Sequence, residues 1–151
     1  MAITASGAYG LTLEKMFLKT QTGSLEADIV WCLLVTDSYA PNFDTHDFVA
    51  DITNEIANGD GYTTGGMDLA SNTVTVGAPA AGQIKFSSTS PAWATSTITS
   101  AMAAVLYFTT GNTTTDQLIY LADFVTAATS SNGTFTVTVH ADGWFNVDYT
   151  P

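Results

Sequence analysis

The apolar positions near the N-terminus follow a helical period. In residues 9–20, the side chains that recur at spacings of three and four form one mainly apolar face: Tyr9, Leu13, Met16, Phe17 and Thr20. Lys15 and Lys19 come late in this segment, where the helix dipole favours cations. The pattern predicts a short helix around residues 9–20 with one mainly apolar face.

Three continuous apolar runs follow, and they predict the centre of a β-sheet. Residues 29–36 (IVWCLLVT), 100–109 (SAMAAVLYFT) and 117–124 (QLIYLADF) are rich in β-branched and aromatic side chains. Such runs are typical of strands that are buried on both faces. Two shorter and more mixed runs, 67–76 and 82–88, are separated by Pro79 and glycines. They predict peripheral strands.

The last two runs alternate strictly and predict a β-hairpin. A two-residue turn at Asp142-Gly143 would mix the apolar and polar faces, so we predict a three-residue loop, 141–143, with Gly143 at positive φ. This register makes three apolar pairs: Val139 with Phe145, Val137 with Val147 and Phe135 with Tyr149. His140 would then lie opposite Trp144 on the outer, solvated face.

Together these elements predict a mainly β protein. A length of 151 residues suits one domain, which we place over residues 1–151. We expect an antiparallel β-sandwich or rolled sheet of about six to eight strands. A short N-terminal helix and a helical turn near residues 44–51 complete the expected fold.

The charge balance excludes several partners. Three lysines face fourteen acidic residues, there is no arginine, and the net charge is −11. Nucleic-acid binding depends on Lys and Arg that neutralise phosphates, so neither nucleic acid nor an anionic membrane is an expected partner. Charged residues make up only 11% of the chain, against about a quarter in typical domains. A neutral polar surface of this kind is common among all-β domains and among subunits of assemblies.

The sequence shows neither a cleaved export signal nor a membrane span. The first ten residues lack a basic segment followed by an apolar one, and no apolar run approaches the ~18 residues of a membrane span. We therefore expect a soluble protein that is not exported by a cleaved signal. The sequons at 112–114 and 132–134 are then expected to be turns rather than glycosylation sites.

The acidic stretch DTHDFVAD, residues 44–51, is the main candidate for chemistry. Asp44, His46, Asp47 and Asp51 are the candidate metal ligands, and Asp44, His46 and Asp47 are also the candidates for a hydrolase site. The D-x-D-x-D-G pattern of calcium loops and the H-E-x-x-H pattern of zinc sites are both missing. The competing prediction is structural: Asp44 as helix N-cap, with Asp47 three residues later in a capping box. Phe43 and Phe48 suit a hydrophobic staple around it. We expect no metal site.

The rest of the chain contains few candidate catalytic residues. Cys32 lies in the most apolar run, so it is expected to be buried rather than paired with His46 or His140 as a nucleophile. No G-x-S-x-G motif is present. The glycine-rich residues 59–66 (GDGYTTGG) lack the ending of a phosphate loop and predict consecutive turns anchored by Tyr62. We expect a protein that is not an enzyme and binds no cofactor.

Residues 33–76 contain an ordered set of turn and loop motifs: Ser38, Tyr39, Pro41, Asn42, Asp44, Thr45, His46, Asp51, Ile52 and Gly59 to Gly66 with Tyr62 and Thr63. This block resembles a family of small structural proteins of tailed bacteriophages. QLIYLADF and the closing GTFTVTVHADGWFNV resemble later strands of the family. The resemblance covers most of the chain from about residue 8 and departs from the family pattern at its start and in residues 125–133.

This resemblance implies a virion structural protein, on either the head or the tail. The first expectation is a capsid decoration, or cement, protein on the capsid surface, made in the host cytoplasm. Its partners would be the major capsid protein and copies of itself, as a homotrimer. A minor tail or head–tail connector protein is the alternative. A carbohydrate-binding β-sandwich module, with Trp93 and Trp144 as surface stacking platforms, is an alternative from another class.

Overall fold

A computed structural model describes residues 3–21 and 23–150, and its described part is mainly β with antiparallel sheets. Residues 1–2, 22 and 151, which the predicted domain includes, lie outside the described residues. The elements in chain order are β1 (Gly7–Ala8), α1 (Gly10–Leu18), β2 (Val30–Thr36), a 3-10 turn (Val49–Asp51), β3 (Met67–Asp68), β4 (Thr73–Val76), β5 (Gln83–Ser87), β6 (Ala92–Ser96), β7 (Ala101–Phe108), β8 (Gln117–Ala128), β9 (Gly133–Thr136) and β10 (Phe145–Asp148). The mainly β class and the short N-terminal helix are thus confirmed.

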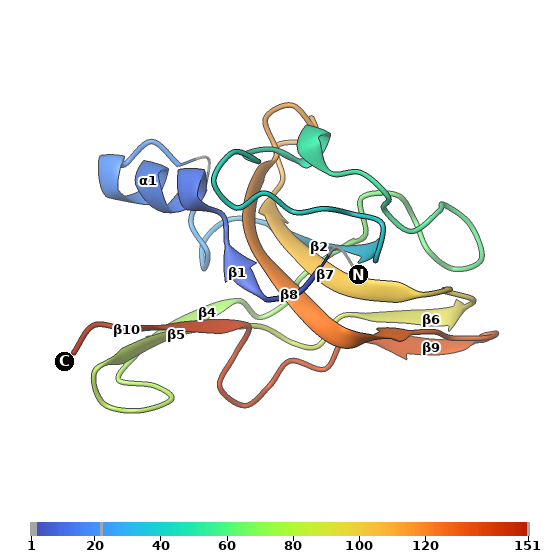
Figure 1. The fold of residues 1–151 in the computed structure, drawn as a ribbon. Coiled ribbons are helices and arrows are strands. Elements are labelled where there is room, and N and C mark those ends of the chain that lie inside the picture. Colours follow the sequence, from blue (N-terminus) through green and yellow to red (C-terminus); the bar gives the residue numbers. More distant parts are fainter. Residues whose placement is uncertain (1–2, 22, 151) are drawn as a thin grey trace.

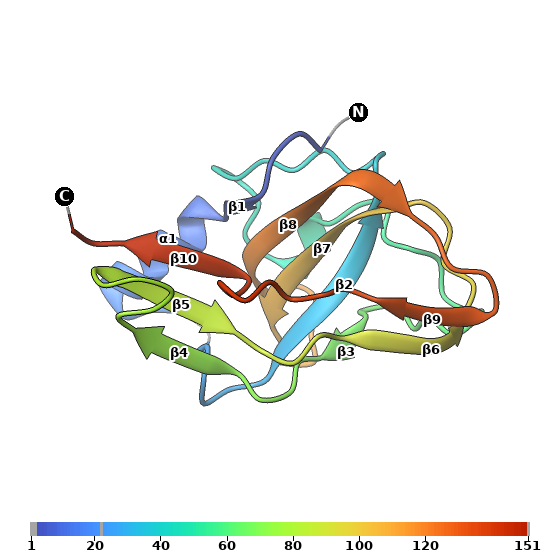
Figure 2. The same ribbon diagram turned by 90° about the horizontal axis from the view of Figure 1, so that it is seen from below.

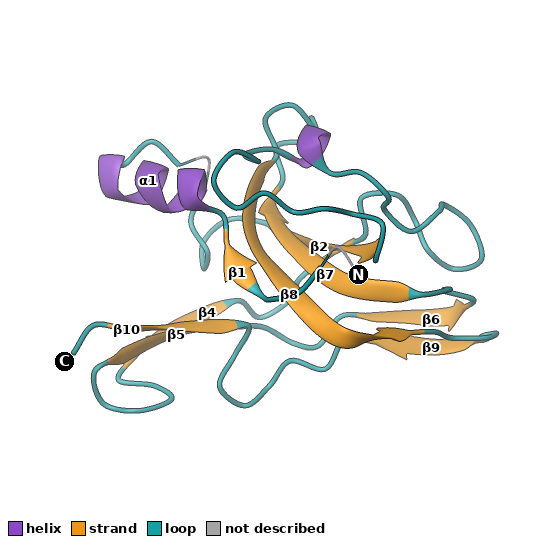
Figure 3. Ribbon diagram, in the orientation of Figure 1, coloured by secondary structure: helices purple, strands orange, loops and turns teal. Residues whose placement is uncertain are grey.

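The strands form one large sheet and two small ones. The five-stranded sheet has the order β1-β8-β7-β2-β3, so the three continuous apolar runs are its central strands, as predicted. The smaller sheets have the orders β10-β5-β4 and β6-β9. Figures 1 and 3 show both small sheets lying side by side along one face of the large sheet.

The central strands are apolar throughout because both faces of the large sheet are covered. In β2, Cys32 and Leu34 point into the cluster shared with the small sheets, which includes Phe86, Phe135 and Trp144. Leu33 and Val35 point into a second cluster on the opposite face. Alternate residues of a strand face opposite sides, so a strand between two cores has no polar face.

The second cluster is closed by the N-terminal segment and the long β2–β3 connection. Its members outside the sheet are mainly Ile3, Tyr9, Tyr39 and Val49, and all four are buried. The connection, residues 37–66, contains most of the block that carries the resemblance. That block therefore forms part of the covering of the large sheet.

The predicted C-terminal hairpin is wrong. β9 pairs with β6 and β10 pairs with β5, and between the two halves only an isolated bridge joins His140 to Gly143. Alternation decides which face of a strand is buried, but any neighbouring strand can satisfy its backbone. Gly143 does have a positive φ, 86°, and its Cα approaches the backbone of Phe86 so closely that a Cβ would collide with it.

Trp144 is also placed differently from the prediction. Its side chain is buried in the first cluster, where its indole N–H donates to Oγ of Ser88 at 2.8 Å. The expected outer-face pair of His140 and Trp144 is therefore wrong, because the chain turns inward after Gly143 instead of continuing as a hairpin.

Helix α1 lies within the predicted residues 9–20, and part of its apolar face is exposed. Thr12 is its buried side chain, and the Thr12 hydroxyl donates to the carbonyl of Leu118. Leu13 and Phe17, two members of the predicted apolar face, are exposed. The apolar period locates the helix correctly, but the contacts on β8 are made by its polar side.

Candidate functional site

The acidic stretch 44–51 is tied to helix α1 and to the start of β8. The ammonium group of Lys15 forms an ion pair with Asp47 and lies 4.5 Å from the centroid of the Phe48 ring. The backbone carbonyl of Asp47 accepts the N–H of Leu118 at 2.8 Å. Asp47 therefore connects the acidic stretch to helix α1 through its side chain and to β8 through its backbone.

The capping residue of this stretch is Asp51, and not Asp44 as predicted. Oδ2 of Asp51 accepts the backbone N–H groups of Asp47 and Phe48 at 2.9 and 3.0 Å. These two donors lower the pKa of the Asp51 carboxyl, because they stabilise its charged form. The turn is a single 3-10 turn at Val49–Asp51, so the helical turn is confirmed but shorter than expected.

Asp44 belongs to the preceding turn, where Asn42 provides the side-chain acceptor. Oδ1 of Asn42 accepts the N–H groups of Asp44 and Thr45 at 3.1 and 3.2 Å. Within the described residues, the carboxylate of Asp44 has no hydrogen-bond partner. The predicted capping box at Asp44 is wrong because the 3-10 turn begins at Val49, five residues after Asp44. The two phenylalanines of the predicted staple have other partners in the described residues. The ring centroid of Phe43 lies 5.3 Å from that of Tyr9, and the ring of Phe48 lies beneath the ammonium group of Lys15.

His46 takes part in a chain of hydrogen bonds with two tyrosines. Its Nδ1 lies 2.9 Å from the hydroxyl of Tyr39, which in turn lies 3.0 Å from the hydroxyl of Tyr9. Burial raises the pKa of Tyr39 to about 12, and burial raises the pKa of Tyr9 further still. Both phenols therefore stay protonated near neutral pH and act as fixed hydrogen-bonding groups.

Three of the four candidate ligands in this stretch are engaged by other groups of the protein. Across residues 3–21 and 23–150, no three His, Cys, Asp or Glu side chains gather closely enough to hold a metal ion. The side chains of Asp47, Asp51 and His46 are each directed at a partner that stabilises the fold. Cys32 is fully buried, as predicted, and burial raises the pKa of its thiol.

The glycine-rich residues 59–66 form the predicted turns, and Tyr62 anchors them. The hydroxyl of Tyr62 donates to Glu55 at 2.7 Å and accepts the N–H of Leu34 at 3.0 Å. Glu55 also accepts the N–H of Gly65 at 2.6 Å. All four glycines of the stretch have positive φ, and at Gly66 a Cβ would collide with the backbone of β2. Gly66 is therefore required by the close packing of this loop on the sheet, and the positive φ favours glycine at the other three positions.

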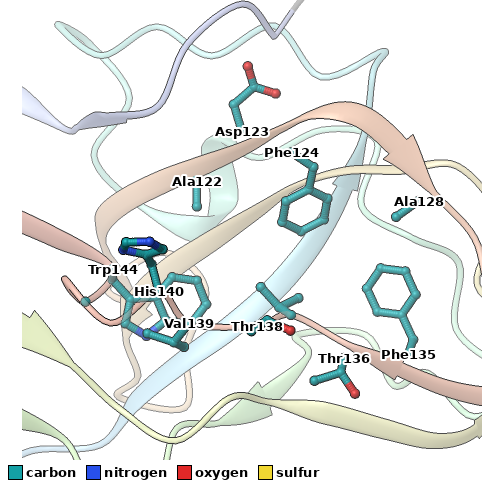
Figure 4. Close-up of a pocket in the computed structure, with 12 residues that line it drawn as sticks. Ala122, Asp123, Phe124, Ala128, Phe135, Thr136, Thr138, Val139, His140 and Trp144 are labelled. Atoms are coloured by element: carbon teal, nitrogen blue, oxygen red, sulfur yellow. The ribbon is translucent and has the colours of Figure 1, made fainter.

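A groove of about 290 Å³ opens between β8 and the segment that follows β9 (Figure 4). Phe124, Phe135 and Val139 line it with apolar surface, and His140 lies at one end. The titratable groups that line it are Asp123 and His140. His140 is exposed and lies 3.2 Å from the carboxylate of Asp142. The groove is suited to apolar contact, and Thr136 and Thr138 add hydroxyl groups to its lining.

The two tryptophans predicted to stack on sugars are not on the surface. Trp93 is packed between Tyr62 and Phe135, with ring centroids 5.8 and 6.1 Å away. Trp93 and Trp144 are both buried members of the first cluster. The stacking platforms of the carbohydrate-binding alternative are therefore contradicted, because these side chains form the core between the sheets.

A second hollow, of about 570 Å³, lies between helix α1 and β10. Leu13 of the helix and Val147 of β10 line it. Five exposed apolar side chains belong to these two elements and their ends, and we call them the α1–β10 patch: Leu13, Phe17, Leu18, Val147 and Tyr149. The sequence contains all of them, but hydrophobic periodicity does not say whether an apolar side chain faces the core or the surface, so the patch could not be found from the sequence.

No family model, curated protein or solved structure matches this chain. None of the helices in the described residues is long and apolar enough to cross a membrane.

Proposed function

We propose that this chain is a virion structural protein that binds the outer surface of a capsid shell and stabilises it. The observation that carries the proposal is the α1–β10 patch, in which Phe17 is 88% exposed on a helix whose polar side faces the protein. Exposed apolar side chains on two elements at the same end of a small protein (Figures 1 and 2) are typical of a surface that a partner covers. A subunit of an assembly has such a surface.

The state of the acidic stretch also supports a structural role. Residues 37–66 carry the resemblance to bacteriophage structural proteins, and their polar groups are used to hold this covering on the large sheet. Asp47 forms an ion pair with Lys15, and the carboxylate of Glu55 accepts hydrogen bonds from the Tyr62 hydroxyl and the Gly65 N–H. Motif residues such as Tyr62 and Gly65 are thus used to hold the covering in place, and this use agrees with a mechanical role for the protein.

The net charge of −11 agrees with a place outside the shell. An acidic subunit is repelled by packaged DNA and has no cationic surface with which to bind it. Many copies, each contributing a modest free energy of binding, would stabilise neighbouring capsid subunits because ligands that bind the assembled state shift the equilibrium toward it.

Binding to empty shells tests this function. Purified chain is mixed with decoration-free shells of the virus that encodes it, and the pelleted chain is quantified over a concentration series. Saturation at a regular multiple of the shell's symmetry, together with a higher melting temperature of the shells, supports decoration. Saturation at a dozen copies or fewer would instead indicate the head–tail connector. Absence of binding would contradict both.

A further inference from the structure

Strand β9 has a neighbouring strand on one side only, because it forms a two-stranded sheet with β6. Just after β9, the N–H groups of Val137 and Val139 each donate to residues 90–91 at 3.0 Å. Backbone groups of an extended chain alternate in direction, so the N–H and C=O groups of Thr136 and Thr138 point away from β6. Within the described residues, these outward groups have no hydrogen-bond partner. We call residues 136–138 the open edge.

The open edge lacks the usual protection of an edge strand. Natural proteins protect such edges with charged side chains, with proline, or with a covering segment. Residues 133–139 (GTFTVTV) contain no charged residue and no proline, and Thr136 and Thr138 are exposed. The edge is therefore suited to pairing with a further strand.

The apolar groove lies between this edge and the large sheet. Figure 4 shows Phe124 of β8 and Phe135 of β9 entering it from opposite sides. A strand added beside β9 would continue the small sheet, so every second side chain would point toward β8. Those side chains would enter the groove of about 290 Å³. Because Phe124, Phe135 and Val139 line the groove, apolar side chains fit it best.

A second copy of the open edge could not fill the groove. Phe135 and Val137, the inward side chains of this segment, are already buried in the core of their own chain. The side chains that remain on its other face are those of Thr136 and Thr138. Two copies, each with a net charge of −11, would also repel each other. The occupant is therefore an extended segment of a different protein.

The charges around the groove indicate a further property of this segment. Asp123 lies at one rim of the groove, and Asp142 lies 3.2 Å from His140 at one end. No lysine is among the residues that line the groove. Carboxylates without a nearby cation favour a partner that supplies a lysine or arginine.

We propose that the open edge binds an extended peptide segment of another protein as an additional antiparallel or parallel strand. Backbone hydrogen bonds to Thr136 and Thr138 hold the segment, and the groove selects apolar side chains at every second position. A lysine or arginine of the segment meets Asp123 or Asp142. The inference goes beyond the proposed function, because β9 lies at the end of the molecule away from α1 (Figures 1 and 2).

Selection from a random peptide library on the immobilised full chain tests the proposal. The selected peptides are expected to have apolar residues at alternate positions together with lysine or arginine. The peptide selected most strongly is synthesised, and its affinity is measured by fluorescence anisotropy. Thr138→Pro is expected to weaken binding about tenfold or more, since proline lacks the N–H that would donate to the peptide.

Val76→Pro is the matched control. Val76 lies on β4, another edge strand, opposite Ile84 in a pair whose outer backbone groups also point away from the sheet. Its substitution removes an outward N–H without changing the groove, so the peptide should bind this variant as it binds the wild type. Thermal unfolding checks that both variants are folded.

Amide hydrogen exchange in the wild-type protein gives a second result that does not depend on how well a variant folds. The N–H groups of Thr136 and Thr138 should exchange rapidly in the free protein and slowly when the peptide is bound. Failure to select any peptide would overturn the proposal, and so would a peptide that leaves both amides unprotected or binds Thr138→Pro as tightly as the wild type. Protection of these amides in the free protein that increases with its concentration would identify a second copy as the occupant and would also overturn it. None of these measurements involves shells, so the proposed function is tested separately.

Discussion

The hydroxyl groups of Tyr9 and Tyr39 lie 3.0 Å apart beneath the covering of the large sheet, although the two residues are 30 positions apart. The hydroxyl of Tyr39 also lies 2.9 Å from Nδ1 of His46. A hydroxyl can donate one hydrogen bond and accept others, so Tyr39 links the N-terminal segment to the acidic stretch. This link holds together the residues that carry the resemblance.

Tyr39→Phe removes this link and leaves two polar groups without their partner. We expect a loss of about 1–2 kcal/mol in the free energy of unfolding, the usual effect of leaving buried hydrogen-bonding groups unpaired. Denaturant titration measures it. Tyr149→Phe is the control, because Tyr149 is an exposed side chain and its substitution should have little effect. Equal stabilities of the two variants would show that the chain of hydroxyls contributes nothing.

Asp51→Ala and Asp44→Ala separate the observed cap from the predicted one. Asp51→Ala should cost about 1 kcal/mol, as a lost cap does, whereas Asp44→Ala should be nearly neutral. The pKa of Asp51 is lowered from its usual 3.8, so its contribution is present above that pH and is lost as the pH falls through the native pKa. The difference in the free energy of unfolding between Asp51→Ala and the wild type should therefore disappear at acidic pH. A larger loss in Asp44→Ala would contradict the observed capping.

Glu55 should give stability the opposite pH dependence. Burial raises the pKa of Glu55 above its usual 4.5, so its contribution is greatest below that value and is lost as the pH rises through the native pKa. From pH 4.5 upward, the wild type should therefore lose stability relative to Glu55→Gln. Unfolding curves at a series of pH values measure this difference. Glu26→Gln, at an exposed position, is the control, and its stability should change with pH as that of the wild type does. If the stability of Glu55→Gln also followed the wild type at every pH, the raised pKa of Glu55 would be contradicted.

Cys32 should be inert in the native protein. Its side chain is fully buried and burial raises the pKa of its thiol, so a thiol reagent can reach it only when the structure opens. We expect no labelling by a chromogenic disulfide reagent before the denaturant transition and one equivalent after it. Rapid labelling of folded protein would show that β2 is exposed in solution.

The sequence predicts the central strands because their signal is local. The continuous apolar runs that become β2, β7 and β8 require burial on both faces, whatever their order in the sheet. The same holds for the turns of residues 59–66, where glycine is needed for backbone geometry. These features follow from the residues themselves, so a single sequence is enough to find them.

The pairing partner of a strand and the direction in which a helix face points depend on residues far away in the sequence. These features were not predicted correctly or not predicted at all. Alternation in residues 134–140 and 144–149 is satisfied equally by a hairpin and by pairing with β6 and β5. The period of α1 defines an apolar stripe, but it does not say whether that stripe faces the core or another molecule. At residues 44–51 the spacing of the acids suits a cap at Asp44 as well as at Asp51, and only the position of the backbone decides between them.

Counting copies of this chain in purified virions tests the central claim most directly. Isotope-dilution mass spectrometry against the major capsid protein of the encoding virus gives the number per particle. The proposed decoration of the shell predicts hundreds of copies per virion, in a simple ratio to the capsid protein. A dozen copies or fewer, or none, would contradict it.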